Sequence, residues 1–165
     1  MSALTPITGS YWVVPGKLLA GEYPGDPDPR VAAERLERFR SAGIRLFVDL
    51  TEPLELEPYV HLIGEAIHER RPIPDLGTTT RRKVREILDL LDSTLSEGDG
   101  AYVHCWQGLG RTGTVIGCWL VRHGLDEGEP LGRLAELRSD LPTAGRQSPQ
   151  TKAQKRMIRR WRKGD

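Results

Sequence analysis

The sequence lacks the features that mark several classes of protein. It has only two cysteines in 165 residues, too few for the disulfide framework of a small secreted protein. No apolar run approaches the roughly 20 residues of a membrane span, and residues 1–10 lack the charged and then apolar layout of a signal peptide. The formal net charge is only +1, so the overall balance favours neither nucleic acid nor an anionic membrane. We therefore expect a cytoplasmic protein that does not insert into a membrane.

Positive charge is nevertheless concentrated at the end of the chain. Residues 151–165 carry seven basic side chains and one acidic one. Apolar residues recur at helical spacing among them, which predicts an amphipathic helix with its basic face in solvent. The alternative is a surface that binds an anionic partner. Nucleic acid is not favoured as that partner, because aromatic residues are not regularly interleaved with the basic ones.

The order of the expected elements predicts the fold class. The length suits a single domain over 1–165 without a linker or an internal repeat. Hydrophobic patterns and turn residues predict short strands at 11–14, 17–20, 44–50 and 101–105, with an extended segment at 70–75. They predict helices at 31–42, 59–67, 81–97, 111–123 and 131–138, and a last helix opened by Ser148-Pro149. This alternation indicates an α/β fold with a central, largely parallel sheet flanked by helices.

One stretch between a predicted strand and a predicted helix carries most of the chemical information. It reads His104-Cys-Trp-Gln-Gly-Leu-Gly-Arg-Thr-Gly113. Its three glycines also match the dinucleotide fingerprint G-x-G-x-x-G. That interpretation is disfavoured, because the next predicted element is again a helix and no second strand ends in a ribose-binding acid.

The better interpretation takes Cys105 and Arg111 as the two ends of an anion-binding loop. Gly108 and Gly110 let the backbone turn its N–H groups inward at the start of a helix, where the helix dipole favours negative charge. Arg111 offers a planar fork of donors that grips two phosphate oxygens at once. The same positive field favours a thiolate on Cys105, so a nucleophile would face a bound phosphoryl group.

This stretch resembles the signature loop of the protein tyrosine phosphatase superfamily, His-Cys-x5-Arg-Ser/Thr, at every fixed position. The resemblance implies a small dual-specificity-like phosphatase fold that needs no metal or organic cofactor. It also implies that His104 orients and tunes Cys105, that Cys105 attacks phosphorus and that Thr112 hydrogen-bonds to the thiolate. The backbone amides of residues 106–111 would hold the phosphate oxygens. The remaining residues expected at the substrate are Trp106, Gln107, Gly108, Leu109 and Gly110.

Phosphoryl transfer to a thiolate also needs a proton donor for the departing oxygen. In the superfamily that donor is an aspartate on a mobile loop upstream of the cysteine. Asp75 lies 30 residues before Cys105, after an extended segment and before a long helix, and fits that order. Asp49, at the end of a predicted strand, is the second candidate.

Glutamines near the last helix are candidates for positioning the hydrolytic water. Superfamily members with strict tyrosine preference carry two glutamines four residues apart at the start of that helix, and Gln150 and Gln154 have this spacing. Of the two, Gln150 is the preferred candidate, and Gln147 is a rival. The alternative is that these are polar residues on the exposed first turns of a helix.

The second cysteine and the remaining histidines predict no further chemistry. Cys118 lies about two turns into the helix after Arg111, so we expect a buried apolar side chain. A redox partnership with Cys105 is the less favoured alternative. His61, His68 and His123 supply no recognisable metal-ligand set with Cys105.

These observations together predict a cysteine-dependent phosphomonoester hydrolase acting on phosphorylated proteins as a monomer. Phosphotyrosine is the favoured substrate, and the shallow site of a small member would also accept phosphoserine and phosphothreonine. Lipid-directed members often carry lysines in the loop, where this chain has Trp106, Gln107 and Leu109. The alternatives are an inactive phosphate-binding module, a phosphatase acting on phosphoinositides or RNA ends, and a rhodanese-like sulfurtransferase.

Overall fold

The computed structural model describes residues 4–165, so the start of the predicted domain at Met1 lies outside the described residues. The strands are β1 (Ser10–Val14), β2 (Leu18–Gly21), β3 (Ile44–Asp49), β4 (Ile67–Arg70) and β5 (Gly100–His104). They form one sheet in the order β1-β2-β5-β3-β4. Strands β2, β5, β3 and β4 run parallel, and only β1 is antiparallel to its neighbour. The expected largely parallel sheet is confirmed.

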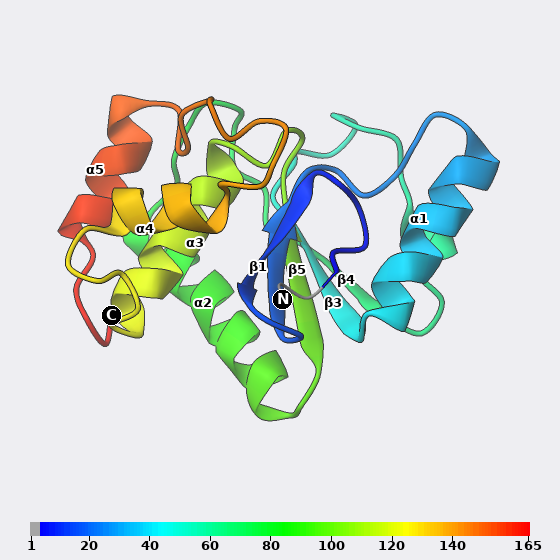
Figure 1. Cartoon of the computed structure of the whole chain (residues 1–165), viewed down its shortest axis with the longest axis horizontal. Helices are drawn as coiled ribbons and strands as arrows, with labels where there is room; N and C mark the ends of the chain where they lie inside the picture. The colour runs from blue at the N-terminus through cyan, green and yellow to red at the C-terminus, as the bar shows by residue number, and fades with distance from the viewer. Residues whose placement is uncertain (1–3) are drawn as a thin grey trace.

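Helices cover both faces of this sheet (Figure 1). They are α1 (Pro29–Ser41), α2 (Arg81–Ser96), α3 (Arg111–Arg122), α4 (Pro130–Leu137) and α5 (Lys152–Arg160). Helix α1 lies on one face, and α2 to α5 lie on the other. The side chains of Asp28 and Thr80 cap α1 and α2 by accepting backbone N–H groups of their first turns. No helix within residues 4–165 is both long and apolar enough to cross a bilayer.

Two predicted elements differ from the structure. The helix expected at 59–67 is only a short 3₁₀ turn over Val60–Leu62, followed by Gly64 in the left-handed region and then by strand β4. Ile67 is 58% exposed, so the apolar spacing there does not trace one buried helix face. The last helix begins at Lys152 rather than at Ser148, because the Thr151 side chain caps it by accepting the backbone N–H of Gln154.

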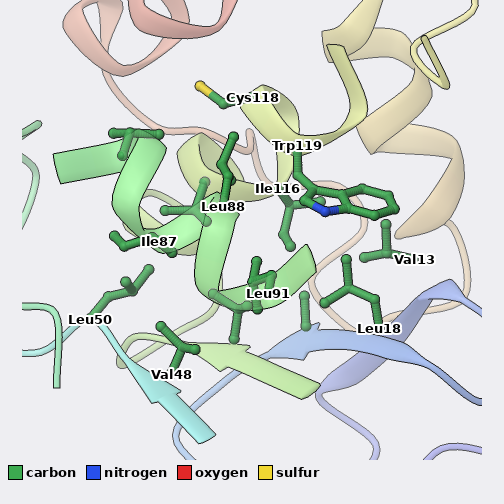
Figure 2. Close-up of a cluster of buried hydrophobic side chains, with 14 of the residues drawn as sticks. Val13, Leu18, Val48, Leu50, Ile87, Leu88, Leu91, Ile116, Cys118 and Trp119 are labelled. Carbon is green, nitrogen blue, oxygen red and sulfur yellow. The ribbon is translucent and has the colours of Figure 1, made fainter. Parts of the chain in front are cut away.

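The larger core lies between the sheet and helices α2 and α3. Figure 2 shows α2 placing Ile87, Leu88 and Leu91 over strand residues such as Val48. Each fully buried leucine or isoleucine contributes about 1.5–3 kcal/mol to folding. This core fixes α3 against the sheet and so fixes the segment that joins β5 to α3.

A smaller aromatic core fills the other face, under α1. Phe39, Phe47 and Tyr102 pack with ring centroids 4.5 to 6.1 Å apart. Tyr59 lies 5.8 Å from Phe47 and 5.4 Å from the ring of His104. The aromatic core therefore continues to the histidine at the end of β5.

Candidate active site

The predicted anion loop lies where the parallel strands end and α3 begins. Cys105 directly follows β5, and Arg111 is the first residue of α3. Cys105 is 3% exposed and Arg111 is 1% exposed. In sheets of this kind, ligands bind outside the carboxyl ends of the strands, and the first amides of a helix favour anions.

The backbone requires glycine at one position of this loop and brings a second glycine close to neighbouring side chains. Gly108 has φ +72°, and a Cβ there would lie 2.5 Å from the Gly21 carbonyl carbon. Gly110 has an ordinary φ, and a Cβ there would lie 2.6 Å from Oε1 at the end of the Gln150 side chain. The loop therefore packs its backbone directly against the end of β2 and the segment before α5.

Hydrogen bonds hold several loop carbonyls away from the loop interior. The Trp106 carbonyl accepts the Tyr23 N–H at 2.9 Å, and the Leu109 carbonyl accepts the Ser148 hydroxyl at 2.7 Å. The Gly110 carbonyl accepts the Thr114 hydroxyl at 2.8 Å. In a trans peptide the following N–H points opposite to the carbonyl. The amides that follow these carbonyls therefore point away from these partners and are available for an anion.

A cavity of about 240 Å³ opens over this loop. Six of its ten lining residues belong to the loop from Cys105 to Arg111: Cys105, Trp106, Gln107, Leu109, Gly110 and Arg111. Asp75, Leu76, Arg146 and Gln150 complete it from other segments. The cavity thus brings the predicted nucleophile, arginine and preferred acid together. The predicted residues His104, Gly108 and Thr112 do not line it.

Arg111 is held by a carboxylate that the sequence did not point to. Its Nη1 and Nη2 atoms donate to the two carboxylate oxygens of Glu55 at 2.9 and 2.6 Å, a bidentate pair. Nη1 also donates to the Ile73 carbonyl at 3.1 Å. The hydrogen bond from Arg111 lowers the pKa of Glu55, although partial burial opposes the shift. The guanidinium is therefore fixed in orientation at the edge of the cavity.

The two candidate acids occupy very different surroundings. Asp75 lines the cavity with its side chain 55% exposed, and its Oδ1 lies 3.4 Å from Nη2 of Arg111. Asp49 is 3% exposed and does not line the cavity. Burial alone would raise the pKa of Asp49, but hydrogen bonds from His68 and Thr51 and the nearby His104 hold it well below the usual value. Asp49 is therefore an ionised structural carboxylate in this fold.

His104 contacts the cysteine backbone as the resemblance implied. Its Nδ1 lies 2.9 Å from the Cys105 carbonyl oxygen, and its Nε2 lies 2.5 Å from the Tyr59 hydroxyl. Because a carbonyl only accepts, Nδ1 carries the proton and Nε2 accepts from Tyr59. Burial lowers the pKa of His104, an effect that the nearby Asp49 partly opposes. The ring is thus neutral in a fixed tautomer, and its effect on Cys105 reactivity stays a prediction.

Thr112 does not make the contact expected of it. Its hydroxyl is buried and has no hydrogen-bond partner among residues 4–165, so the expected bond to Cys105 is not formed in this structure. A hydroxyl rotates about one bond and can donate when an acceptor charge develops nearby. Its role toward a thiolate stays a prediction.

The three glutamine candidates separate clearly. Gln150 lines the cavity. Gln154 is fully buried, where its Oε1 accepts the Gln150 and Thr151 backbone N–H groups and its Nε2 donates to the Gly77 carbonyl at 3.1 Å. Gln147 is exposed and accepts from Lys155. Gln154 therefore joins the start of α5 to the loop that carries Asp75, and only Gln150 faces the proposed substrate.

Cys118 belongs to the hydrophobic core and not to the cavity. It is fully buried, and Figure 2 shows its side chain on the side of α3 that faces away from the sheet. Burial raises the pKa of this thiol strongly. Both cysteines are free. Within residues 4–165, no group of three or more His, Cys, Asp or Glu is arranged to hold a metal ion.

A family model matches residues 25–125, more than half of the chain, and its description is a DSP-PTPase phosphatase of a polymorphic toxin system. The chain belongs to this DSP-PTPase phosphatase family. The match includes the whole signature stretch and Asp75, so the resemblance drawn from the loop is confirmed at the level of the family.

Several named phosphatases are similar to this family member. The putative tyrosine phosphatase 067L of invertebrate iridescent virus 3 is 35% identical over 113 residues, which cover 65% of this chain and 43% of that protein. The dual specificity protein phosphatase CDC14A of Homo sapiens is 32% identical over 132 residues, which cover 68% of this chain and 19% of that protein. The chain thus spans less than half the length of these curated relatives.

Two solved structures have the same fold as this chain. The crystal structure of Tk-PTP gives a TM-score of 0.70 at 24% identity and covers 93% of this chain and 94% of its own. That of kinase associated phosphatase gives a TM-score of 0.66 at 24% identity and covers 86% of this chain and 83% of its own. The predicted small dual-specificity-like phosphatase fold is therefore confirmed.

Proposed function

We propose that this protein is a cysteine-dependent phosphomonoester hydrolase that acts on phosphorylated proteins through a cysteinyl-phosphate intermediate. The observation that carries the proposal is one cavity lined by Cys105, Arg111 and Asp75 at the start of α3. These residues supply a nucleophile, a bidentate anion binder and a proton donor. Membership of a phosphatase family supports the reaction class.

In the first step the Cys105 thiolate attacks phosphorus and the ester P–O bond breaks. Asp75 gives its proton to the departing oxygen, while Arg111 and the loop amides stabilise the equatorial oxygens. In the second step water attacks the cysteinyl phosphate, the S–P bond breaks, and Asp75 takes up the proton of the water. Gln150 lies where it could orient that water. Inorganic phosphate and the free thiolate result.

The cavity rim supports phosphotyrosine as the favoured substrate. Trp106 and Leu76 line the cavity and are 53% and 55% exposed, so they can flank an aromatic ring. The low volume and open rim also suit phosphoserine and phosphothreonine. We propose that the enzyme acts as a monomer built as one domain. A thiolate nucleophile suits a reducing compartment, and we propose the cytoplasm.

Hydrolysis of para-nitrophenyl phosphate with EDTA and no added metal tests this function. Cys105→Ser should abolish turnover, and Asp75→Asn should lower kcat roughly 10²–10⁴-fold, as for loss of a general acid. The control variants Cys118→Ser and Asp99→Asn make the same two replacements at residues that do not line the cavity, and they should remain active.

Other outcomes redirect the assignment. Full activity of Asp75→Asn would remove the acid role from that residue. Absence of turnover in the reduced wild-type protein, together with phosphate binding, would identify a binding module instead of an enzyme.

A further inference from the structure

A second hollow lies beside the proposed catalytic cavity. It is a groove of about 220 Å³ between the start of α2 and the face of α5. Its lining residues are Thr78, Arg81, Ala153, Arg156, Met157 and Arg160. Leu76 lines the catalytic cavity and Thr78 lines the groove, so the two sites are two residues apart along the chain, a separation of at most about 7 Å. The groove is thus a separate hollow that lies next to the cavity.

The segments around the groove are strongly basic. Residues 81–86 and 152–165 together carry eleven basic side chains and two acidic ones. Arg81 is already engaged, because it pairs with Asp165 at 2.6 Å and stacks over Trp161. Arg156 and Arg160 are exposed, and no carboxylate of the described residues forms an ion pair with either. Two guanidinium groups in the groove are therefore free to bind anions.

The groove lacks what a nucleic acid or a lipid surface would use in addition to charge. Trp161 is buried and offers no face on which a base could stack. The exposed large apolar side chains of residues 4–165 lie outside these two segments, so no apolar group here would enter a membrane. A shallow groove edged by arginines next to a phosphoryl site fits an extended polypeptide with acidic side chains.

We propose that this groove binds acidic side chains of the phosphorylated polypeptide substrate; this inference rests on the proposed phosphatase function. An extended peptide advances about 3.3 Å per residue. About 7 Å corresponds to roughly two residues, so we place the acidic side chains just beyond that separation, roughly three to five positions from the phosphorylated residue. Arg156 and Arg160 are positioning residues for the substrate and take no part in the chemical step.

Paired phosphotyrosine peptides test the proposal. One carries glutamates three to five positions from the phosphotyrosine on both sides, and the other carries glutamines there. The wild-type protein should cleave the glutamate peptide with about tenfold higher kcat/KM, from about threefold for each ion pair. This preference should shrink at high salt.

Charge reversal at the groove gives the sharpest comparison. The double variant Arg156→Glu with Arg160→Glu should lose the glutamate preference and prefer a third peptide with lysines at the same positions. The control variant, Arg38→Glu with Arg45→Glu, makes the same charge change on exposed residues of α1 and β3. It should keep the wild-type preference, and all three proteins should hydrolyse para-nitrophenyl phosphate equally.

Each other result overturns the inference in a distinguishable way. Equal cleavage of the peptides by an active wild-type enzyme, or an unchanged preference in the groove variant, would reject the groove and leave the phosphatase function intact. Binding of anionic vesicles or RNA through these arginines without peptide discrimination would assign the surface to that ligand. Absence of turnover on every substrate would defeat the proposed function and, with it, the substrate role of the groove.

Discussion

At the residue scale, the site depends on how one buried cation is held. Arg111 is almost fully buried, and such a charge is costly unless it is paired. Glu55 supplies the pair, and it does so with both oxygens. The geometry leaves the guanidinium with a fixed plane at the cavity, which is what bidentate binding of a phosphoryl group requires.

Removing this carboxylate should therefore impair catalysis without touching the reacting groups. We expect Glu55→Gln to lower kcat/KM for para-nitrophenyl phosphate by roughly 10- to 100-fold, because a small misplacement of a binding group has such effects. Steady-state kinetics measures the change. Glu57→Gln removes a neighbouring charge that makes no ion pair within residues 4–165 and should stay near wild type. Equal rates for the two variants would show that Arg111 needs no such partner.

At the element scale, the proposed catalytic loop lies where three segments meet. The loop after β5 packs against the segment before α5, and Gln154 of α5 binds the Gly77 carbonyl. The buried amide of Gln154 thereby connects the phosphate site to the loop that carries Asp75.

We expect Gln154→Ala to reduce stability and rate together. It leaves the Gly77 carbonyl and two backbone N–H groups without their partner, which should cost about 1–3 kcal/mol in the free energy of unfolding. Urea unfolding measures that loss, and kcat should fall because Asp75 is less well placed. The exposed Gln147 is the matched control. A Gln154→Ala protein of unchanged stability would contradict this account.

Helices and strands could be predicted from the sequence where the spacing of apolar residues matches the side chains that are buried in the fold. Helix α2 has a continuous apolar stripe and a threonine cap, and the structure has both. The segment 59–67 has similar spacing, but its buried residues pack against the aromatic core and His104 from a turn. Long-range packing overrides periodicity in such a short segment.

Only the part of the site that lies in one continuous segment could be predicted from the sequence. Cys105 and Arg111 lie in one continuous motif whose chemistry can be inferred from residue types. Glu55 and Arg146 lie 56 residues before and 35 residues after Arg111, in loops without periodicity. Nothing local in the sequence indicates that Glu55 binds Arg111 or that Arg146 lines the cavity, because only the tertiary fold brings these residues together.

At the scale of the whole molecule, the stability of the fold depends on the protonation state of one histidine in the sheet. His104 is fully buried at the end of the central strand β5 and is neutral when folded. Burial, the largest influence, lowers its pKa from 6.5 in the folded protein. The unfolded chain therefore binds more protons just below that value, and stability falls as pH falls through this window.

We expect the free energy of unfolding to decrease between about pH 6.5 and the lowered pKa, by up to about 1.4 kcal/mol per pH unit. Asp49 is ionised above about pH 5 in both the folded and the unfolded chain, because its pKa is below its usual value when folded, and it therefore adds no slope there. His104→Asn should flatten the dependence, whereas the exposed His61→Asn should not. Urea unfolding at several pH values measures the slope, and parallel curves for wild type and His104→Asn would disprove the link.

The cavity residues come from separate segments of the chain, and this affects how substrate preference can change by substitution. Cys105 and Arg111 come from one short turn, whereas Asp75 and Gln150 arrive on separate surface loops. Affinity for the phosphoryl group and assistance to the leaving group are thus encoded in different stretches of chain. Exchanging the exposed part of the loop at 74–79 with that of another family member would change which esters are cleaved, while Cys105 and Arg111 kept their positions.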